Sequence, residues 1–283
     1  MIKISMMARG KDQGEYAGLV KHGKEIGLDA IDIHMDRHIN REPKFMATLK
    51  KQCLDAGLPI GYFSSGHSMV GPAEQRQARI AQAKSDVDGA SVMGAQLCHA
   101  FARHNWPAKE EEQEKFWGPM IEDFQATADY AAEKGVVLGL QNHNHGSFAM
   151  NANQVLRILR ETGRKNLTYI MDCGQWQGSI GGSPRGWTDT SVDIYDHYMK
   201  RVAPYATCVR AKIYKIDNGW EEWIDYPRVF KMLQAVDFNG NVSMVFEGGD
   251  PPRNRYSKEE CLKIAVPYLR EVIKRSDDRG GRV

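Results

Sequence analysis

The feature that most constrains the fold is a repeated alternation of short apolar runs with longer amphipathic segments. Eight runs read as strands of a sheet that is covered on both faces, because they are apolar almost throughout. These runs lie at 2–7, 30–35, 59–65, 95–102, 136–143, 167–172, 207–216 and 242–248. Amphipathic helices are predicted between them, for example at 15–27, 43–57, 73–94 and 114–135, and a Gly closes each one.

This alternation predicts an α/β fold, a (β/α)8 or TIM barrel, as a single domain over residues 1–283. The strands recur about every 34 residues, which leaves room for a strand, a helix and two loops. An open doubly wound sheet would normally carry a GxGxxG turn after its first strand. Residues 6–16 read MMARGKDQGEY instead, and no linker or low-complexity stretch divides the chain.

Composition excludes several classes of partner. Hydrophobic residues make up 42% and charged residues 26% of the chain, and 38 Lys and Arg balance 36 Asp and Glu. A net charge of +2 gives no reason to expect nucleic acid or an anionic membrane. No apolar run approaches the roughly 18 residues of a membrane span. Five scattered cysteines without a CxxC pair suit reduced thiols, so we expect a cytoplasmic protein.

Polar residues gather where the predicted strands end, which is where the chemistry of a TIM barrel is located. Seven of the nine histidines lie in or just after predicted strands. The segment VVLGLQNHNHGSF (136–148) shows the pattern most clearly, because a buried strand stops at Gln141 and is followed by Asn142, His143 and His145.

Four segments resemble, in their order and spacing, the xylose isomerase-like barrel superfamily and its sugar phosphate isomerase/epimerase branch. They are GLQNHNHG (139–146), YIMDCGQW (169–176), VRAKIYKI (209–216) and SMVFEGG (243–249). The resemblance extends to AGLVKHGKEIGLDAIDIH (17–34) and EECLKIAVPYLREVI (259–273), and so covers nearly the whole chain.

The resemblance implies a divalent metal held by Glu, Asp, His and Glu at the ends of the last four strands. Such a metal polarises sugar oxygens, and the two Glu move a proton between adjacent carbons. Asp172 and Glu247 match two of the four positions. Gln141 stands where the first Glu is expected, and Arg210 stands in place of the His. A guanidinium cannot ligate a cation, because it is donor-only and always charged.

Three interpretations of this substituted site stay open. In the first, no metal binds, Arg210 pairs with the two carboxylates, and Gln141 accepts one guanidinium N–H. In the second, His143 and His145 join Asp172 and Glu247 in a rearranged site for Mn or Mg. In the third, the histidines make only structural hydrogen bonds. The Gln and Arg substitutions therefore make a metal cofactor doubtful.

The resemblance also suggests catalytic roles. Glu247 is the expected general base, with Asp172 and His143 in support beside Gln141. Lys212 lies two residues from Arg210 and shares its face of the strand. It is either a base with a lowered pKa or the partner of Glu247 or Asp172 in a salt bridge. Arg210 and Lys212 together would stabilise an enolate-like oxygen.

Further residues are candidates for binding the substrate. The full set is His34, His67, His99, His145, Trp106, Trp176, Arg210 and Arg253. The rings of Trp106 and Trp176, and that of Trp187, are expected either to stack on a sugar or to pack within loops. Arg210, Lys212 and Lys215, with the Gly-rich loop 179–187, would suit a substrate carboxylate or phosphate. Arg253 and Arg255 are placed to contact substrate or a neighbouring subunit.

The sequence therefore predicts a sugar isomerase or epimerase that acts on a monosaccharide or keto-sugar derivative by removing a proton next to a carbonyl. Two alternatives remain. One is a lyase or hydrolase of keto-sugar glycosides, with His143 or His145 as the acid. The other is a sugar-binding barrel without catalysis. The expected partner is a small carbohydrate, without nucleic acid or membrane, and the chain is a possible homo-oligomer.

Overall fold

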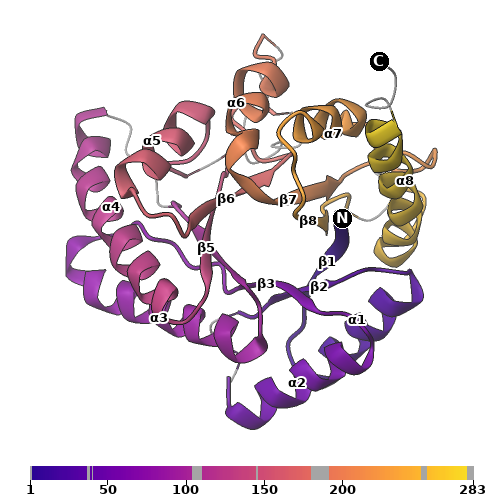
Figure 1. Cartoon of the computed structure of the whole chain (residues 1–283), viewed down its shortest axis with the longest axis horizontal. Helices are drawn as coiled ribbons and strands as arrows, with labels where there is room; N and C mark the ends of the chain where they lie inside the picture. The colour runs from indigo at the N-terminus through magenta and orange to yellow at the C-terminus, as the bar shows by residue number, and fades with distance from the viewer. Residues whose placement is uncertain are drawn as a thin grey trace.

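The computed structural model describes residues 2–36, 39, 41–103, 110–144, 146–179, 191–249 and 254–278. Figure 1 shows its central feature, a ring of strands with helices around it. The strands are β1 (Lys3–Arg9), β2 (Ile31–His34), β3 (Ile60–Ser64), β4 (Leu97–Phe101), β5 (Val137–Gln141), β6 (Leu167–Asp172), β7 (Ala206–Ile213) and β8 (Asn241–Phe246). Each strand pairs in parallel with the next, and β8 pairs with β1, which closes the barrel. The predicted TIM barrel is confirmed.

The helices form the outer layer. They are α1 (Gln13–Glu25), α2 (Pro43–Asp55), α3 (Arg76–Met93), α4 (Glu110–Glu133), α5 (Ala152–Thr162), α6 (Lys200–Val202), α7 (Tyr226–Gln234) and α8 (Lys258–Asp278). The short α6 is extended by a π-helical turn, η3 (Tyr195–Met199), and a 3-10 turn, η4 (Ala203–Tyr205). In the described part of the chain, no helix is both long and apolar enough to cross a bilayer.

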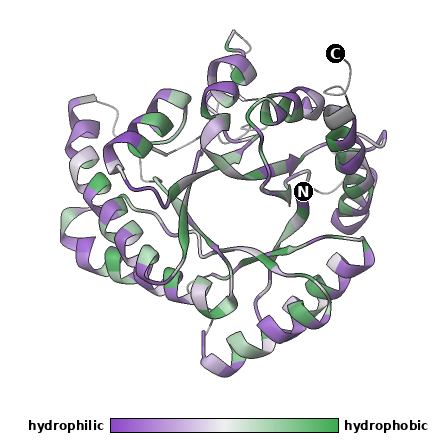
Figure 2. Cartoon of the chain, in the orientation of Figure 1, coloured by the Kyte–Doolittle hydropathy of each residue, from purple (hydrophilic) through white to green (hydrophobic). Residues whose placement is uncertain are grey.

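Local sequence signals set the helix ends. The Asp12 side chain accepts the Glu15 N–H at the start of α1, and Asn151 caps α5 in the same way. Gly94 ends α3 with a φ of 76°, a left-handed conformation that favours glycine. Figure 2 shows hydrophobic and hydrophilic residues mixed along every helix, as expected for helices with one face on the barrel and one on solvent.

The interior of the barrel contains a buried carboxylate as well as apolar side chains. Asp32 on β2 accepts hydrogen bonds from the Ser5 hydroxyl, the Tyr62 backbone N–H at 3.1 Å and Asn241 at 3.0 Å. Gly61 must lack a side chain, because a Cβ there would lie 2.3 Å from an Asp32 oxygen. Burial raises the pKa of Asp32 from 3.8 to about 6, although these hydrogen bonds act in the opposite direction.

The raised pKa makes the contribution of Asp32 to stability dependent on pH. Protonated Asp32 stabilises the fold below pH 3.8, and this contribution is lost as the pH rises through about 6. The neutral variant Asp32→Asn has no such loss. Its free energy of unfolding, relative to wild type, should therefore rise by on the order of 3 kcal/mol between about pH 4 and pH 8. Urea unfolding at the two pH values measures the difference.

A surface carboxylate provides the control for this prediction. Asp55 pairs with Lys51 and is well exposed. Asp55→Asn, measured in parallel, is the matched control for the replacement of a carboxylate at the surface. An offset for Asp32→Asn that is the same at both pH values would contradict the raised pKa of Asp32.

Candidate functional site

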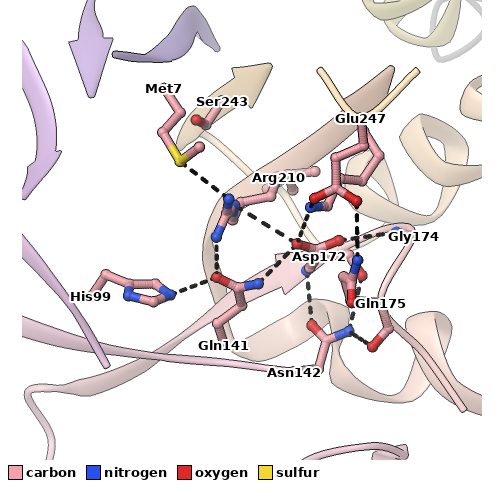
Figure 3. Close-up of polar contacts among 12 residues, drawn as sticks. Met7, His99, Gln141, Asn142, Asp172, Gly174, Gln175, Arg210, Ser243 and Glu247 are labelled. Atoms are coloured by element: carbon pink, nitrogen blue, oxygen red, sulfur yellow. Dashed lines mark hydrogen bonds and ion pairs between the residues drawn. The ribbon is translucent and has the colours of Figure 1, made fainter. Parts of the chain in front are cut away.

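The ends of β5, β6, β7 and β8 bring five charged or amide side chains together at the mouth of the barrel, four of which are labelled in Figure 3. Asp172 and Arg210 are direct partners in the β6–β7 register. Arg210 and Lys212 are two residues apart on β7, so both point to the same side of the strand. Gln141 ends β5, and Glu247 follows β8. The predicted site residues from these four strands therefore do converge.

Gln141 is the centre of this arrangement. Its side-chain oxygen accepts hydrogen bonds from the Arg210 guanidinium and from His99 Nε2, the latter at 2.5 Å. Its side-chain nitrogen donates to Asp172 at 2.8 Å. Because a guanidinium only donates and a carboxylate only accepts, these two partners fix which end of the amide is oxygen. A Glu at this position could not donate, and would instead place a second carboxylate against Asp172.

Asp172 is fully buried and lies between two cations. Its carboxylate accepts the Gly174 N–H at 3.1 Å and lies 3.4 Å from Lys212 Nζ and 3.7 Å from Arg210 Nε. Burial raises the pKa of Asp172, while the charges of Lys212 and Arg210 act in the opposite direction. The neighbouring Asn142 positions the Asp172 backbone, because it accepts the Asp172 N–H at 2.8 Å and donates to its carbonyl at 2.9 Å.

Glu247 is the part of the cluster that opens to solvent. Its side chain is 37% exposed, whereas those of Asp172, Arg210 and Lys212 are 0%, 8% and 3% exposed. Lys212 Nζ donates to one of its carboxylate oxygens, and Gln175 donates to the other at 3.3 Å. Two roles were expected for Lys212, a base or a salt-bridge partner, and the structure contains the salt bridge, to Glu247.

Several other predicted residues have different surroundings from those expected. Trp176 is fully buried and stacks on Tyr198 at 5.4 Å, so its ring is a core group and is not open to a sugar. His99 lies behind Gln141 and not at the surface of the site. His67 is buried, and the buried His143 ring packs edge-on against Phe101.

Two further basic residues that were considered for substrate binding pair with a carboxylate outside this cluster. Lys215 and Arg255 both pair with Asp217. His145, Trp106, Trp187 and Arg253, and most of the Gly-rich loop 179–187, lie outside the described residues. His34 ends β2 and is connected to His99 through Ser64. Asn142 follows a predicted strand but was given no role from the sequence, and Ser64 was not singled out there.

The residues present do not fit the four-ligand metal site that the sequence resemblance implies. Arg210, at the position where that resemblance expects a His, donates to the Gln141 oxygen, the atom that would have to face the ion. Lys212 Nζ donates to a carboxylate oxygen of Glu247, the group that would have to bind the ion. Within the described ranges, no three His, Cys, Asp or Glu side chains are placed to hold a metal, so Asp172, Glu247 and His143 do not form such a set.

Comparison with known proteins agrees with this architecture. A family profile described as xylose isomerase-like TIM barrel matches residues 20–272. No curated protein matches the chain. A solved L-ribulose 3-epimerase superposes with a TM-score of 0.77 at 17% identity, covering 99% of this chain and 97% of its own.

Two further solved structures are similar in the same way. A D-allulose 3-epimerase from Methylomonas sp. has a TM-score of 0.72 at 15% identity, covering 96% of this chain and 98% of its own. A 3-keto-D-glucoside 4-epimerase from E. coli has a TM-score of 0.73 at 13% identity, covering 96% and 100%. At these identities the likeness establishes a shared fold.

The buried charges predict a large effect of removing one of them. Arg210→Met keeps the apolar stem but removes the guanidinium from Gln141 and Asp172. The variant should lose about 3 kcal/mol or more of its unfolding free energy, because a buried carboxylate is left short of positive charge. Urea unfolding at neutral pH measures the loss.

A double-variant cycle separates this effect from simple loss of packing. Adding Asp172→Asn to Arg210→Met should restore part of the stability, since no unbalanced carboxylate remains. Arg160→Met, at an exposed position on α5, should change stability little. A small effect of Arg210→Met, or strict additivity in the double variant, would contradict the proposed charge balance.

Proposed function

The chain belongs to the xylose isomerase-like TIM barrel family, and from this premise we propose that it is an enzyme of the sugar isomerase or epimerase type. The proposal rests on one observation. A partly exposed carboxylate, Glu247, lies at the barrel mouth and pairs with the buried cation Lys212, which together with Arg210 also flanks Asp172. A base beside fixed positive charge is what removal of a proton next to a carbonyl requires.

In the proposed reaction, Glu247 takes a proton from the carbon next to the substrate carbonyl. The electron pair of that C–H bond forms a C=C bond while the π pair of the carbonyl moves to its oxygen, which gives an enolate. Lys212 and Arg210 stabilise the negative oxygen, because they are held in a buried site that does not need to reorganise. Return of the proton from Glu247 to the former carbonyl carbon, with transfer of the adjacent hydroxyl proton to the former carbonyl oxygen, gives an isomer. Delivery of a proton from water to the opposite face of the original carbon gives an epimer.

We propose that Arg210 supplies the fixed positive charge that a metal supplies in the pattern of the superfamily. The Arg210 guanidinium is held in position by its hydrogen bond to Gln141 and by its approach to Asp172. Gln141 is not a base in this scheme, since an amide does not accept a proton at neutral pH. Similarity to L-ribulose, D-allulose and 3-keto-D-glucoside epimerases supports a small sugar or keto-sugar as the substrate.

The catalytic role of Glu247 can be tested by hydrogen exchange. Wild-type protein in D2O should incorporate deuterium next to the carbonyl of at least one of L-ribulose, D-allulose and 3-keto-D-glucoside, as seen by proton NMR. Glu247→Gln should lower the exchange rate by roughly 10²–10⁴-fold, because the base is removed. Glu259→Gln on the exposed first turn of α8 is the matched control.

The outcomes of this experiment separate the alternatives. Equal exchange by wild type and Glu247→Gln would exclude Glu247 as the base. Release of an aglycone from the keto-glucoside would indicate the lyase, which shares the first step. Thermal stabilisation by a sugar with no exchange or turnover would indicate a binding protein.

The proposed role of Arg210 makes a prediction about metal content. The double variant Gln141→Glu/Arg210→His restores the four ligand types and should bind Mn²⁺ near one equivalent per chain. Wild type and the single variant Gln141→Glu should bind little, because the guanidinium repels the ion. Elemental analysis and Mn²⁺ electron paramagnetic resonance measure this without an activity assay. Stoichiometric Mn²⁺ in wild type would contradict the replacement.

A further inference from the structure

Three side chains link the rim of the barrel to Gln141, and we call them the histidine relay: His34, Ser64 and His99. His34 Nδ1 lies 3.2 Å from the Ser64 hydroxyl, and the same hydroxyl lies 3.1 Å from His99 Nδ1. His99 Nε2 reaches the Gln141 oxygen at 2.5 Å. At the outer end, His34 Nε2 lies 3.2 Å from Asp36. Neither the fold nor the proposed reaction accounts for this chain of contacts.

The relay is held rigidly along most of its length. Ser64 and His99 are buried, and the side chain of His34 is 13% exposed. The His99 ring packs edge-on against Phe101 at 4.2 Å and lies beside Tyr62 at 6.2 Å. Only the outer end of the relay is therefore close to water.

The inner end of the relay dictates the direction of its hydrogen bonds. The Gln141 oxygen is an acceptor, because Arg210 donates to the same atom, so His99 must carry its proton on Nε2. Nδ1 of a neutral His99 is then an acceptor, and the Ser64 hydroxyl must donate to it. A hydroxyl has one proton and two lone pairs. The Ser64 oxygen thus accepts from the Gly66 N–H at 3.3 Å and from His34 Nδ1.

The Asp36 carboxylate, which contacts the outer end of the relay, is a hydrogen-bond acceptor as well. Arg9 binds the Asp36 carboxylate with two hydrogen bonds of 2.8 and 3.0 Å. Burial raises the pKa of Asp36, but the hydrogen bond and charge of Arg9 outweigh this and hold it below its ordinary value. The four contacts from Asp36 to Gln141 need four protons, whereas neutral His34, Ser64 and His99 carry only three.

We propose that the relay takes up one proton at His34, and that this proton completes the hydrogen-bond chain through which His99 holds the Gln141 amide against Arg210 and Asp172. His99 is then a positioning residue for the cluster, and His34 is its proton-sensing end. With neutral His34, one of the four contacts has no proton. The Ser64 hydroxyl can then donate either to His34 or to His99.

The charges around the two rings place the proton on His34. Burial and the charge of Arg210 hold the pKa of His99 well below its ordinary value. Burial also lowers the pKa of His34, but Asp36 directly opposes this, while Arg9 and Arg210 lower it further.

A further titratable neighbour of His34 in the described part of the chain, Tyr16, keeps its charge state over this range. The Tyr16 hydroxyl donates to the His34 carbonyl at 2.6 Å, and burial raises the Tyr16 pKa to about 12. Completion of the relay is thus expected below about pH 6.5, the ordinary His value. Because the folded pKa of His34 is lowered, its protonation reduces stability as the pH falls through this range.

Nitrogen NMR of ¹⁵N-histidine-labelled full-length protein tests the proposal without a substrate. His99 should show a protonated Nε2 and an unprotonated Nδ1 between pH 5 and 8. His34 should titrate below pH 6.5, and the His99 Nδ1 signal should follow the same titration curve. A His99 that carries its proton on Nδ1, or that does not follow His34, would overturn the proposal.

Variants show whether the coupling passes through the Ser64 hydroxyl. Ser64→Ala should abolish the response of His99 to the His34 titration, and Ser64→Thr, which keeps a hydroxyl, should retain it. Asp36→Asn should make His34 bind its proton roughly 10-fold more weakly, because the carboxylate is lost. Ser68→Ala removes a hydroxyl that bonds the Arg103 backbone outside the relay and should alter nothing. Retained coupling in a folded Ser64→Ala protein would exclude the relay.

Discussion

The site depends on a single buried amide that faces a cation on one side and an anion on the other. Gln141 accepts from Arg210 and donates to Asp172, so one neutral side chain satisfies both charges. A carboxylate at this position would improve the contact with Arg210 and repel Asp172. An apolar side chain would leave two buried charged groups without a hydrogen bond, at a cost of several kcal/mol.

The barrel makes this arrangement possible because of its register. Asp172 and Arg210 are opposite each other on adjacent strands, and Lys212 follows Arg210 on the same side of β7. Two cations and two carboxylates, those of Asp172 and Glu247, then balance within a few ångströms. A balanced cluster avoids the penalty of an isolated buried charge.

The sequence was sufficient to predict the barrel because apolar runs report burial on both faces of a parallel strand. One of the three interpretations left open also contained the hydrogen bond between Arg210 and Gln141, since the two substitutions change charge in compensating directions. It did not distinguish a ligand platform from a core ring at Trp176, because an isolated Trp after a strand carries no periodic signal. The depth of His99 was missed for a related reason. Strand position shows that a side chain points inward, but not which neighbour covers it.

The hydrogen-bonded network that runs from His34 to Glu247 is buried in its middle and more exposed at its two ends. Its interior, from Ser64 through His99 and Gln141 to Arg210, is buried. Its two ends, Glu247 and the pair of His34 with Asp36, are the parts nearest to water and hold the groups that we propose gain or lose protons. In the proposed reaction, proton exchange is therefore kept at the rim, while the charges that would stabilise a developing anion are shielded from solvent.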